Sequence, residues 1–147
     1  MIAIKLWGGL GNQMFQYAFG KSLSNYLGEQ LFFYISDKNL KLENIDLVQF
    51  NVNITQLSEK DLSKYTKSKG AGLQYRMERL IVKRFPTFNK FLYIEKSLNF
   101  CLIPNKKYIL FDGYWQSYKY FQSNRETLLK EFTLKSNLIN NQIIKII

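Results

Sequence analysis

The chain opens with MIAIKLWGGLGNQMFQYAFGKSLSNYLGEQLFFYI, residues 1–35. Residues 2–7 are mostly apolar and end at glycines, which is typical of a buried strand. Apolar side chains then recur at helical spacing over residues 13–27, and Gly28 is a natural C-terminal stop for that helix. Residues 31–35 are a second apolar run. This order of strand, turn, helix and strand predicts a right-handed parallel crossover.

The rest of the chain extends the pattern. Tyr108 to Phe111 is an apolar run closed by Asp112 and Gly113, and we expect it to be a third strand of the same sheet. Residues 38–72 are polar and weakly periodic, so only short helical pieces and loops are expected there. The predicted fold class is α/β, with a Rossmann-like parallel sheet and helices on both faces.

Two further helices are expected after the third strand. Ser123 and Glu126 have the spacing of a capping box, and the apolar residues that follow would lie on one face of a helix. Residues 138–147 trace one more helical stripe, which ends on IIKII without a stop signal. That ending suggests a chain cut short within a longer fold.

The residue types exclude several kinds of chemistry. The 147 residues contain no histidine and one cysteine, Cys101. A His or Cys metal cluster, a His general base, a Cys–His nucleophile and an internal disulfide are therefore excluded. A lone cysteine is typical of a reducing compartment, and the N-terminus does not look like a secretory signal. The longest apolar run, residues 31–35, is far shorter than the roughly 20 residues that span a bilayer. A cytoplasmic protein is predicted.

The net charge of +10 is concentrated in one segment. Between Lys60 and Lys107 the chain carries twelve Lys or Arg against three acids, a net +9. The densest part is LQYRMERLIVKRF, residues 73–85, which predicts a basic amphipathic helix that Pro86 ends. Its apolar stripe consists of Leu73, Met77, Leu80 and Ile81, and the cations mostly off that stripe are Arg76, Arg79, Lys83 and Arg84.

This basic helix has three interpretations. A surface helix with a solvated basic face is the commonest use of such a pattern. The second interpretation is docking on an anionic membrane surface, because a basic face beside aromatic residues suits lipid headgroups. The four cations would then hold the protein at the inner face of the cytoplasmic membrane. Nucleic acid is the third and is not expected, because no recognition motif accompanies the charge.

The glycine-rich turn GGLGNQ, residues 8–13, lies between the first strand and the first helix. At such a place, backbone amides and the helix dipole can receive a phosphate or a sugar. The turn lacks the third glycine of G-x-G-x-x-G and the Lys-Ser or Lys-Thr pair of a P-loop. Asn12 can cap the helix and Gln13 can point from its first turn. A tight turn with a good N-cap is the purely structural alternative.

A second candidate site is DGYWQSYKYF, residues 112–121. In open α/β sheets, ligands bind beyond the carboxyl ends of the strands, and this segment leaves such an end, as the glycine turn does. Tyr114 and Trp115 offer flat faces for a sugar, whereas Gln116 and Ser117 offer hydrogen bonds. The sequence therefore indicates a second candidate site at a carboxyl end of the predicted strands.

Parts of the same segment also have structural interpretations. Aromatic residues at this spacing are more often core than site, so Trp115, Tyr118 and Phe121 are interpreted as packing residues. Asp112 is the carboxylate placed to act as a base. A solvent-facing or turn-capping aspartate is the alternative for that position.

Together, GGLGNQMFQYAFG (residues 8–20) and FDGYWQSYKYF (residues 111–121) closely resemble the α-1,2-fucosyltransferases of glycosyltransferase family 11. LVQFNV (residues 47–52) and LLKEFTLK (residues 128–135) fit the order of elements in that family. The resemblance implies a galactoside 2-α-L-fucosyltransferase, which transfers L-fucose from GDP-fucose to the 2-hydroxyl of a galactose-type residue with inversion. It also implies a two-domain fold of the GT-B type.

The resemblance further implies roles for particular residues. Residues 1–147 look like the N-terminal, acceptor-side domain, with Gly11, Asn12 and Gln13 facing the interdomain cleft. Tyr114 and Gln116 are expected on the acceptor side. No residue is implied as the catalytic base.

The donor side of the resemblance is incomplete. The GDP-fucose-binding domain carries an H-x-R-R-G-D-Y signature, which a chain without histidine does not contain. We therefore expect an inactive truncated form of the enzyme. The implied partners are GDP-fucose and a galactose-containing glycan, which a lipid could carry at the membrane; no metal or other cofactor is expected. The alternative function is a non-catalytic basic module that binds glycan or membrane surfaces.

Overall fold

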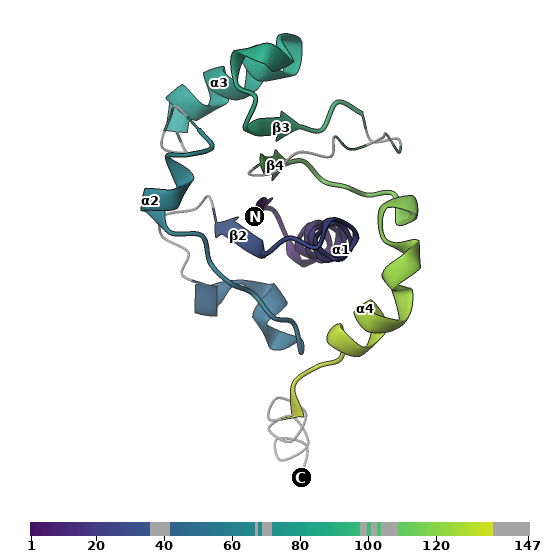
Figure 1. Ribbon diagram of the computed structural model, residues 1–147. Coiled ribbons are helices and arrows are strands. Elements are labelled where there is room, and N and C mark those ends of the chain that lie inside the picture. Colours follow the sequence, from purple (N-terminus) through teal and green to yellow (C-terminus); the bar gives the residue numbers. More distant parts are fainter. Residues whose placement is uncertain are drawn as a thin grey trace.

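The computed structural model describes residues 1–35, 42–66, 68, 72–97, 100, 103 and 109–136. At its centre lies a four-stranded sheet in the order β2-β1-β4-β3, and every neighbouring pair of strands is parallel (Figure 1). The strands are β1 (Ile2–Leu6), β2 (Leu31–Ile35), β3 (Leu92–Ile94) and β4 (Ile109–Asp112). The prediction of an α/β fold with a parallel sheet is confirmed.

The described residues also form four α-helices and five short 3₁₀ helices, of which two 3₁₀ helices and one α-helix follow the last strand. The α-helices are α1 (Leu10–Leu27), α2 (Glu59–Leu62), α3 (Gly72–Arg84) and α4 (Arg125–Glu131). The 3₁₀ helices are η1 (Leu42–Asn44), η2 (Asp46–Gln49), η3 (Pro86–Phe88), η4 (Tyr118–Tyr120) and η5 (Gln122–Asn124). The described part of residues 38–72 holds short helical pieces and loops, as predicted.

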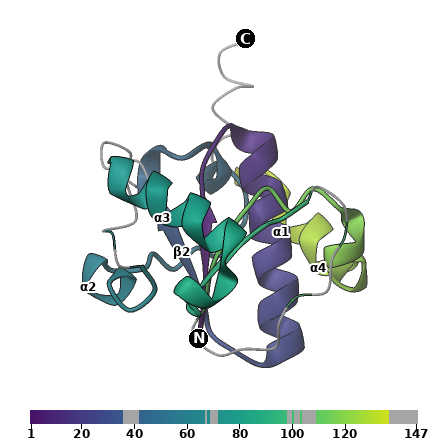
Figure 2. The ribbon, with the colours of Figure 1, turned by 90° about the horizontal axis from the view of Figure 1, so that it is seen from above.

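Side chains of the strands alternate between two buried faces of the sheet. From β1, Ile2, Ile4 and Leu6 join a core with α1, η2 and α4, whereas Ala3 joins a second core with α2 and α3. Figures 1 and 2 show α1 and α4 on one side of the strands and α2 with α3 on the other. Helices on both faces, consistent with a Rossmann-like arrangement, match the prediction.

The first helix begins earlier than the sequence indicated. Its N-cap is Gly9, without a side-chain cap hydrogen bond, so the expectation that Asn12 caps the helix was wrong. Gly8, with a φ of 79°, turns the chain directly into the helix. Gly28 ends the helix in the left-handed conformation that Gly adopts without strain, as predicted. A Cβ at Gly20 would lie 2.6 Å from Ile4 Cγ1, so this glycine lets α1 pack closely on β1.

The predicted start of the helix after the third strand was wrong. The N-cap of α4 is Asn124, again without a side-chain cap hydrogen bond, so Ser123 and Glu126 do not form the expected capping box. The chain instead enters α4 from η5, whose tight turn leaves Ser123 within a preceding helix. The predicted helix over residues 138–147 and Cys101 lie outside the described residues. Among the residues that are described, no helix is both long and apolar enough to cross a bilayer.

Candidate functional site

The two predicted motifs meet at the carboxyl edge of the sheet. Because β1 and β4 are parallel neighbours, the glycine turn and residues 113–117 leave the sheet side by side. Gln116 Nε2 donates a hydrogen bond to Asn12 Oδ1 at 2.9 Å, which joins residues 104 positions apart. The rings of Trp7 and Tyr114 contact each other beside this bond, with centroids 4.4 Å apart. The structure therefore brings together three predicted site residues: Asn12, Tyr114 and Gln116.

Two glutamines of α1 hold these loops in place. Gln13, 5% exposed, donates from Nε2 to Gly8 O at 2.9 Å and accepts from Leu47 N at 3.3 Å. This predicted site residue is therefore engaged with the protein itself. Gln16 accepts from Trp7 N at 3.0 Å and donates to Gly113 O at 3.2 Å, so it ties one motif directly to the other. Sequence reasoning missed Gln16, although it is, like Gln13, a polar residue in a helix that is mostly apolar on its buried side.

Part of this edge remains open. Gly9, Gly11 and Gln116 are exposed, and Asn12 is half-buried. A Cβ added at Gly11 would meet nothing within 4 Å, so space lies directly over the first turn of α1. The accessible groups are two carboxamides, exposed backbone and the half-buried rings of the aromatic pair. Such a surface can offer hydrogen bonds and a flat apolar face to one ligand.

Glu95 fixes the second motif from β3. Its carboxylate, 7% exposed, accepts from Tyr114 N at 2.6 Å and from Trp115 N at 3.1 Å. These bonds hold Trp115 at a φ of 58°, a conformation in which a bulky residue is strained. The sequence did not indicate Glu95, because the short strand before it carries little periodic signal.

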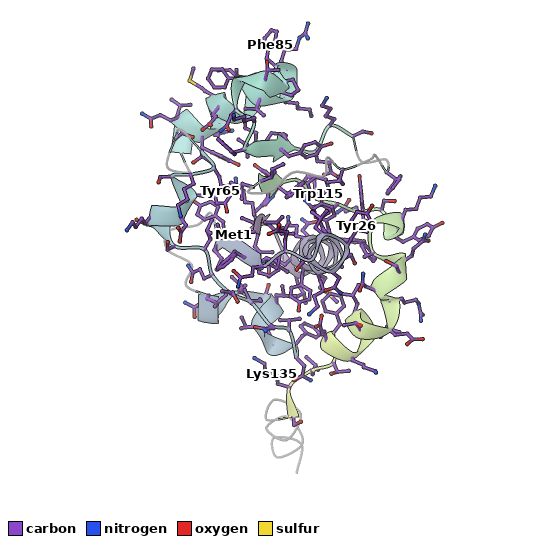
Figure 3. All side chains as sticks on the ribbon, in the orientation of Figure 1. Met1, Tyr26, Tyr65, Phe85, Trp115 and Lys135 are labelled. Carbon is purple, nitrogen blue, oxygen red and sulfur yellow. The ribbon has the colours of Figure 1, made fainter. Side chains whose placement is uncertain are left out.

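The aromatic residues of this segment divide between core and surface. Trp115 is fully buried and stacks on Phe19 with ring centroids 4.1 Å apart, so its interpretation as a packing residue is confirmed (Figure 3). Phe121 is partly buried against the same core. Tyr118 is 62% exposed, and the packing interpretation was wrong for it because η4 turns its side chain outward.

Asp112 lies in a buried polar cluster behind the aromatic pair. It is 1% exposed, and its Oδ2 accepts a hydrogen bond from Tyr75 OH at 2.8 Å. Lys5 Nζ approaches the same oxygen at 3.4 Å, and Arg79 Nε lies 3.2 Å away without an N–H directed at it. Solvent-facing and turn-capping roles are therefore wrong for Asp112. Because Asp112 is 1% exposed and surrounded by Tyr75, Lys5 and Arg79, its carboxylate is not accessible from the surface.

Arg79, one of the four cations of the membrane interpretation, lies toward the site in the structure. Its guanidinium lies 5.8 Å from the centre of the Trp7 ring, and its side chain is 39% exposed. Arg76, Lys83 and Arg84 are exposed elsewhere on α3. Lys5 and Arg79 thus place two cations beside the Asp112 carboxylate, and a second carboxylate, Glu95, lies at the same edge against Tyr114.

The cluster changes the acid–base behaviour of its members. Burial lowers the pKa of Lys5, and the nearby Asp112 carboxylate offsets part of that effect. Burial, together with Asp112, raises the pKa of Tyr75 above its ordinary range. Within the described residues, Asp112 Oδ1 has no hydrogen-bond partner. A lysine within an apolar strand is a signal for such a cluster, because buried lysines are nearly always paired.

Above about pH 10.5, the free energy of unfolding is expected to fall as the pH rises. The pKa values of Tyr17 and Tyr75 are raised in the folded state, so the unfolded chain loses these protons first. Each tyrosine contributes a slope of up to about 1.4 kcal/mol per pH unit. Lys5 acts in the opposite sense, because its lowered pKa makes stability rise with pH until the unfolded lysine has titrated near pH 10.5.

Urea unfolding at several pH values above 10.5 measures this slope. Tyr75→Phe should flatten it, whatever the variant does to stability at neutral pH. Tyr26→Phe is the control, since Tyr26 is 82% exposed on α1. A slope that Tyr75→Phe leaves unchanged would contradict the assignment of this tyrosine as a protonated donor to Asp112.

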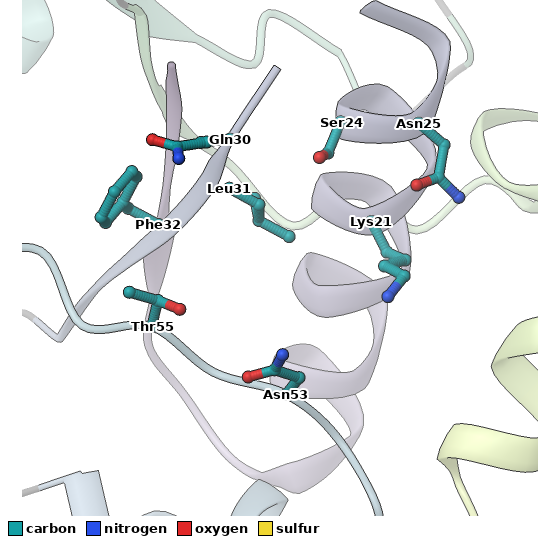
Figure 4. A pocket seen from close by; sticks show the side chains of 8 residues that line it. All are labelled: Lys21, Ser24, Asn25, Gln30, Leu31, Phe32, Asn53 and Thr55. Atoms are coloured by element: carbon teal, nitrogen blue, oxygen red, sulfur yellow. The ribbon is translucent and has the colours of Figure 1, made fainter. Parts of the chain in front are cut away.

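A separate pocket lies at the opposite end of the strands. Its volume is about 300 Å³, and it lies between α1 and the start of β2 (Figure 4). Two of its polar side chains are already engaged: Lys21 pairs with Glu131 at 2.8 Å, and Asn25 donates to Asn124 at 2.8 Å. We assign it no ligand. Among the described residues, no group of three or more His, Cys, Asp or Glu could hold a metal ion.

Comparisons with known proteins give this chain no relative. No protein-family model, curated protein or solved structure matches it. A function is therefore inferred from the two motifs and from the chemistry of the carboxyl edge where they meet.

Proposed function

We propose that this chain is the acceptor-side domain of a galactoside α-1,2-fucosyltransferase of glycosyltransferase family 11, of the GT-B type. In this proposal the carboxyl edge binds the galactose end of a glycan acceptor. The observation that carries the proposal is the hydrogen bond from Gln116 to Asn12, which unites the two motifs of the resemblance at one ligand-accessible place. Parallel α/β sheets generally bind ligands beyond the carboxyl ends of their strands.

The residues at this edge suit a sugar. Galactose presents hydroxyl groups around its ring and an apolar face of C–H groups. The carboxamides of Asn12 and Gln116 can each donate and accept hydrogen bonds with hydroxyls. The aromatic pair of Trp7 and Tyr114, half-buried beside them, can cover the apolar face. The open space over Gly11 gives a ligand room to approach the turn.

The proposed reaction also needs positive charge near the cleft. In an inverting transfer, the acceptor 2-hydroxyl bonds to C1 of fucose and gives its proton to solvent water, while the bond from C1 to the diphosphate breaks and GDP leaves as an anion. Cations and oriented amides stabilise such a leaving group. Arg79, held beside Trp7 by Asp112, supplies one cation at this edge. Asp112 itself is too buried to take the acceptor proton. We therefore propose that its role is to hold Arg79 in position.

Titration of the isotope-labelled chain with lactose, followed by NMR, tests the proposal. Lactose should shift the side-chain amide signals of Asn12 and Gln116 and the indole signal of Trp7. We expect a dissociation constant on the order of 1 mM, about −4 kcal/mol, because the open edge offers few contacts. Maltose, which lacks galactose, is the matched sugar and should bind more weakly. Equal shifts with both sugars, or none with lactose, would remove the basis for the assignment.

Substitution of Asn12 separates a binding role from a structural one. Asn12→Ser should weaken lactose binding roughly fivefold, the effect of one hydrogen bond, with little change in melting temperature. Asn12→Asp keeps an oxygen that Gln116 can donate to but removes the amide donor, so it should weaken lactose binding while preserving the bridge. Asn44→Ser on the exposed η1 is the control. Unchanged affinity in both Asn12 variants would leave Asn12 as a loop bridge alone.

A further inference from the structure

Helix α3 presents its apolar stripe to solvent. Three residues of the stripe predicted from the sequence, Leu73, Met77 and Leu80, are 73%, 57% and 69% exposed. The buried residues of α3 are instead Tyr75, Glu78 and Val82. The stripe follows positions i, i+4 and i+7, so these side chains share one face of the helix. Ile81 and Phe85, 37% and 57% exposed, extend it along one side.

Polar contacts explain why this face is left outside. Tyr75 donates to Asp112 at 2.8 Å, which fixes one turn of α3 toward the sheet. One turn further, Glu78 accepts from Ser68 N at 3.0 Å and from Asn89 Nδ2 at 2.8 Å. A buried carboxylate is stable only while it is hydrogen-bonded, so these bonds are needed to keep Glu78 inside the protein. The inward face of α3 thus combines these polar contacts with the packing of Tyr75 and Val82 in the second core.

The exposed part of α3 carries cations and no anion. Arg76, Lys83 and Arg84 are all exposed, whereas Glu78 is the single acid of the helix and is 5% exposed. The basic and apolar character continues beyond Pro86, where Lys90 is exposed and Phe91 is 39% exposed. Phe85 lies at the outer end of α3, far from the core, in Figure 3. We refer to the surface of Leu73, Arg76, Met77, Leu80, Ile81, Lys83, Arg84 and Phe85 as the α3 face.

We propose that the α3 face binds the surface of an anionic lipid bilayer, with its apolar side chains inserted at the headgroup boundary. Helices with Lys and Arg beside exposed Leu, Ile and Phe lie in the plane of the interface in this way. The long stems of Arg and Lys can stay with the apolar side chains while their charges reach the phosphates. This binding does not depend on the proposed sugar chemistry.

Charge decides between a bilayer and other occupants. A second copy of this chain would place the same three cations opposite one another, which opposes pairing through this face. A lipid surface rich in anionic headgroups complements the charge and also accepts the apolar stripe. Helix α3, with 13 residues, is about 20 Å long, so it offers one continuous strip of contact.

Vesicle flotation of the 147-residue chain tests the inference. We expect binding to phosphatidylcholine vesicles that contain about one third phosphatidylglycerol, and little binding to pure phosphatidylcholine. Changing Arg76, Lys83 and Arg84 together to Gln should weaken binding roughly 100-fold, because each cation contributes about fivefold at an anionic surface. The matched control changes Lys96, Lys119 and Lys130 to Gln, which removes the same charge from other exposed positions.

A second pair of measurements tests the apolar part. Leu80→Ser should weaken binding to the anionic vesicles at all salt concentrations, whereas salt alone should screen the contribution of the cations. In a Phe85→Trp variant, the added fluorescence should be quenched by phospholipids brominated along their acyl chains. Both substituted residues are exposed, so neither change should disturb folding.

Several results would overturn the inference. Equal binding to charged and neutral vesicles would point to non-specific apolar adhesion, and equal loss in the two triple variants would point to net charge alone. Absence of binding to anionic vesicles at low salt would also reject it. Concentration-dependent dimerisation in sedimentation, abolished by Leu80→Ser, would identify a second copy as the occupant of the α3 face.

Discussion

Asp112→Asn is expected to lower the free energy of unfolding by about 3–5 kcal/mol, because removing one member of a buried ion pair leaves the other charge unpaired. Asparagine nearly matches aspartate in shape and can still accept from Tyr75, so the loss would come from charge rather than from packing. The unpaired charge of Lys5 would account for most of the loss, since its side chain is 11% exposed and poorly solvated. Arg79, 39% exposed, can be solvated by water. Urea unfolding at pH 7 measures the change.

A double-mutant cycle with Lys5→Met makes this prediction specific. If Lys5 and Asp112 stabilise each other, the double variant should be more stable than the sum of the single effects implies, by roughly 1–3 kcal/mol. Asp61→Asn is the control for an exposed pair, because Asp61 contacts Lys64 at the surface; its stability should stay close to that of the parent. Simple additivity in the cycle would show that the two residues are not coupled.

Gly113→Ala is expected to lower the free energy of unfolding by about 2–3 kcal/mol, as overpacking of a filled site does. A Cβ there would lie 2.4 Å from Glu95 Cβ and 2.9 Å from Trp115 Cε2. Neither neighbour can move easily, since Glu95 holds two backbone amides and Trp115 is stacked in the core. The shift should also be visible in the near-ultraviolet circular dichroism of Trp115.

Gly11→Ala is the matched substitution at the same edge. A Cβ at Gly11 meets nothing within 4 Å, and alanine favours the first turn of a helix, so stability should be unchanged or rise by up to about 1 kcal/mol. If lactose approaches this turn as proposed, the same methyl group should weaken its binding. A comparable loss of stability in both alanine variants would contradict the packing described around Gly113.

Strands β1 and β2 and the first helix were predictable from residues 1–35, and β4 from the apolar run at residues 108–111. Two continuous apolar runs flank a long segment with helical periodicity, and this order indicates a strand–helix–strand crossover with parallel strands. β3 was not predicted, because three residues carry too little periodicity to stand out from a loop. Its presence depends on pairing with β4, a contact that local sequence does not encode.

The two motifs were predictable as candidate sites at carboxyl ends of strands, but the contact between them and the chemistry around them were not. Strand order places Gly11, Asn12 and Gln116 at one edge, as the position of the motifs after apolar strands indicated. The face of α3 was not predictable, because hydropathy alone favours burying Leu80 over Glu78. The hydrogen bonds from Ser68 and Asn89 to Glu78 reverse that preference, and Arg79 lies toward the site because it pairs with the Asp112 carboxylate.

The pairing of β1 with β4 has a consequence for how this protein is made. Residues 1–35 can form their strand–helix–strand unit as soon as they emerge during synthesis, but the other edge of β1 stays unpaired until residues 109–112 arrive. An apolar strand edge exposed for that interval is a template for pairing with other chains. The long-range closure is also the slow kind of folding step. The demand for chaperone protection should therefore be greatest for nascent chains that end before β4.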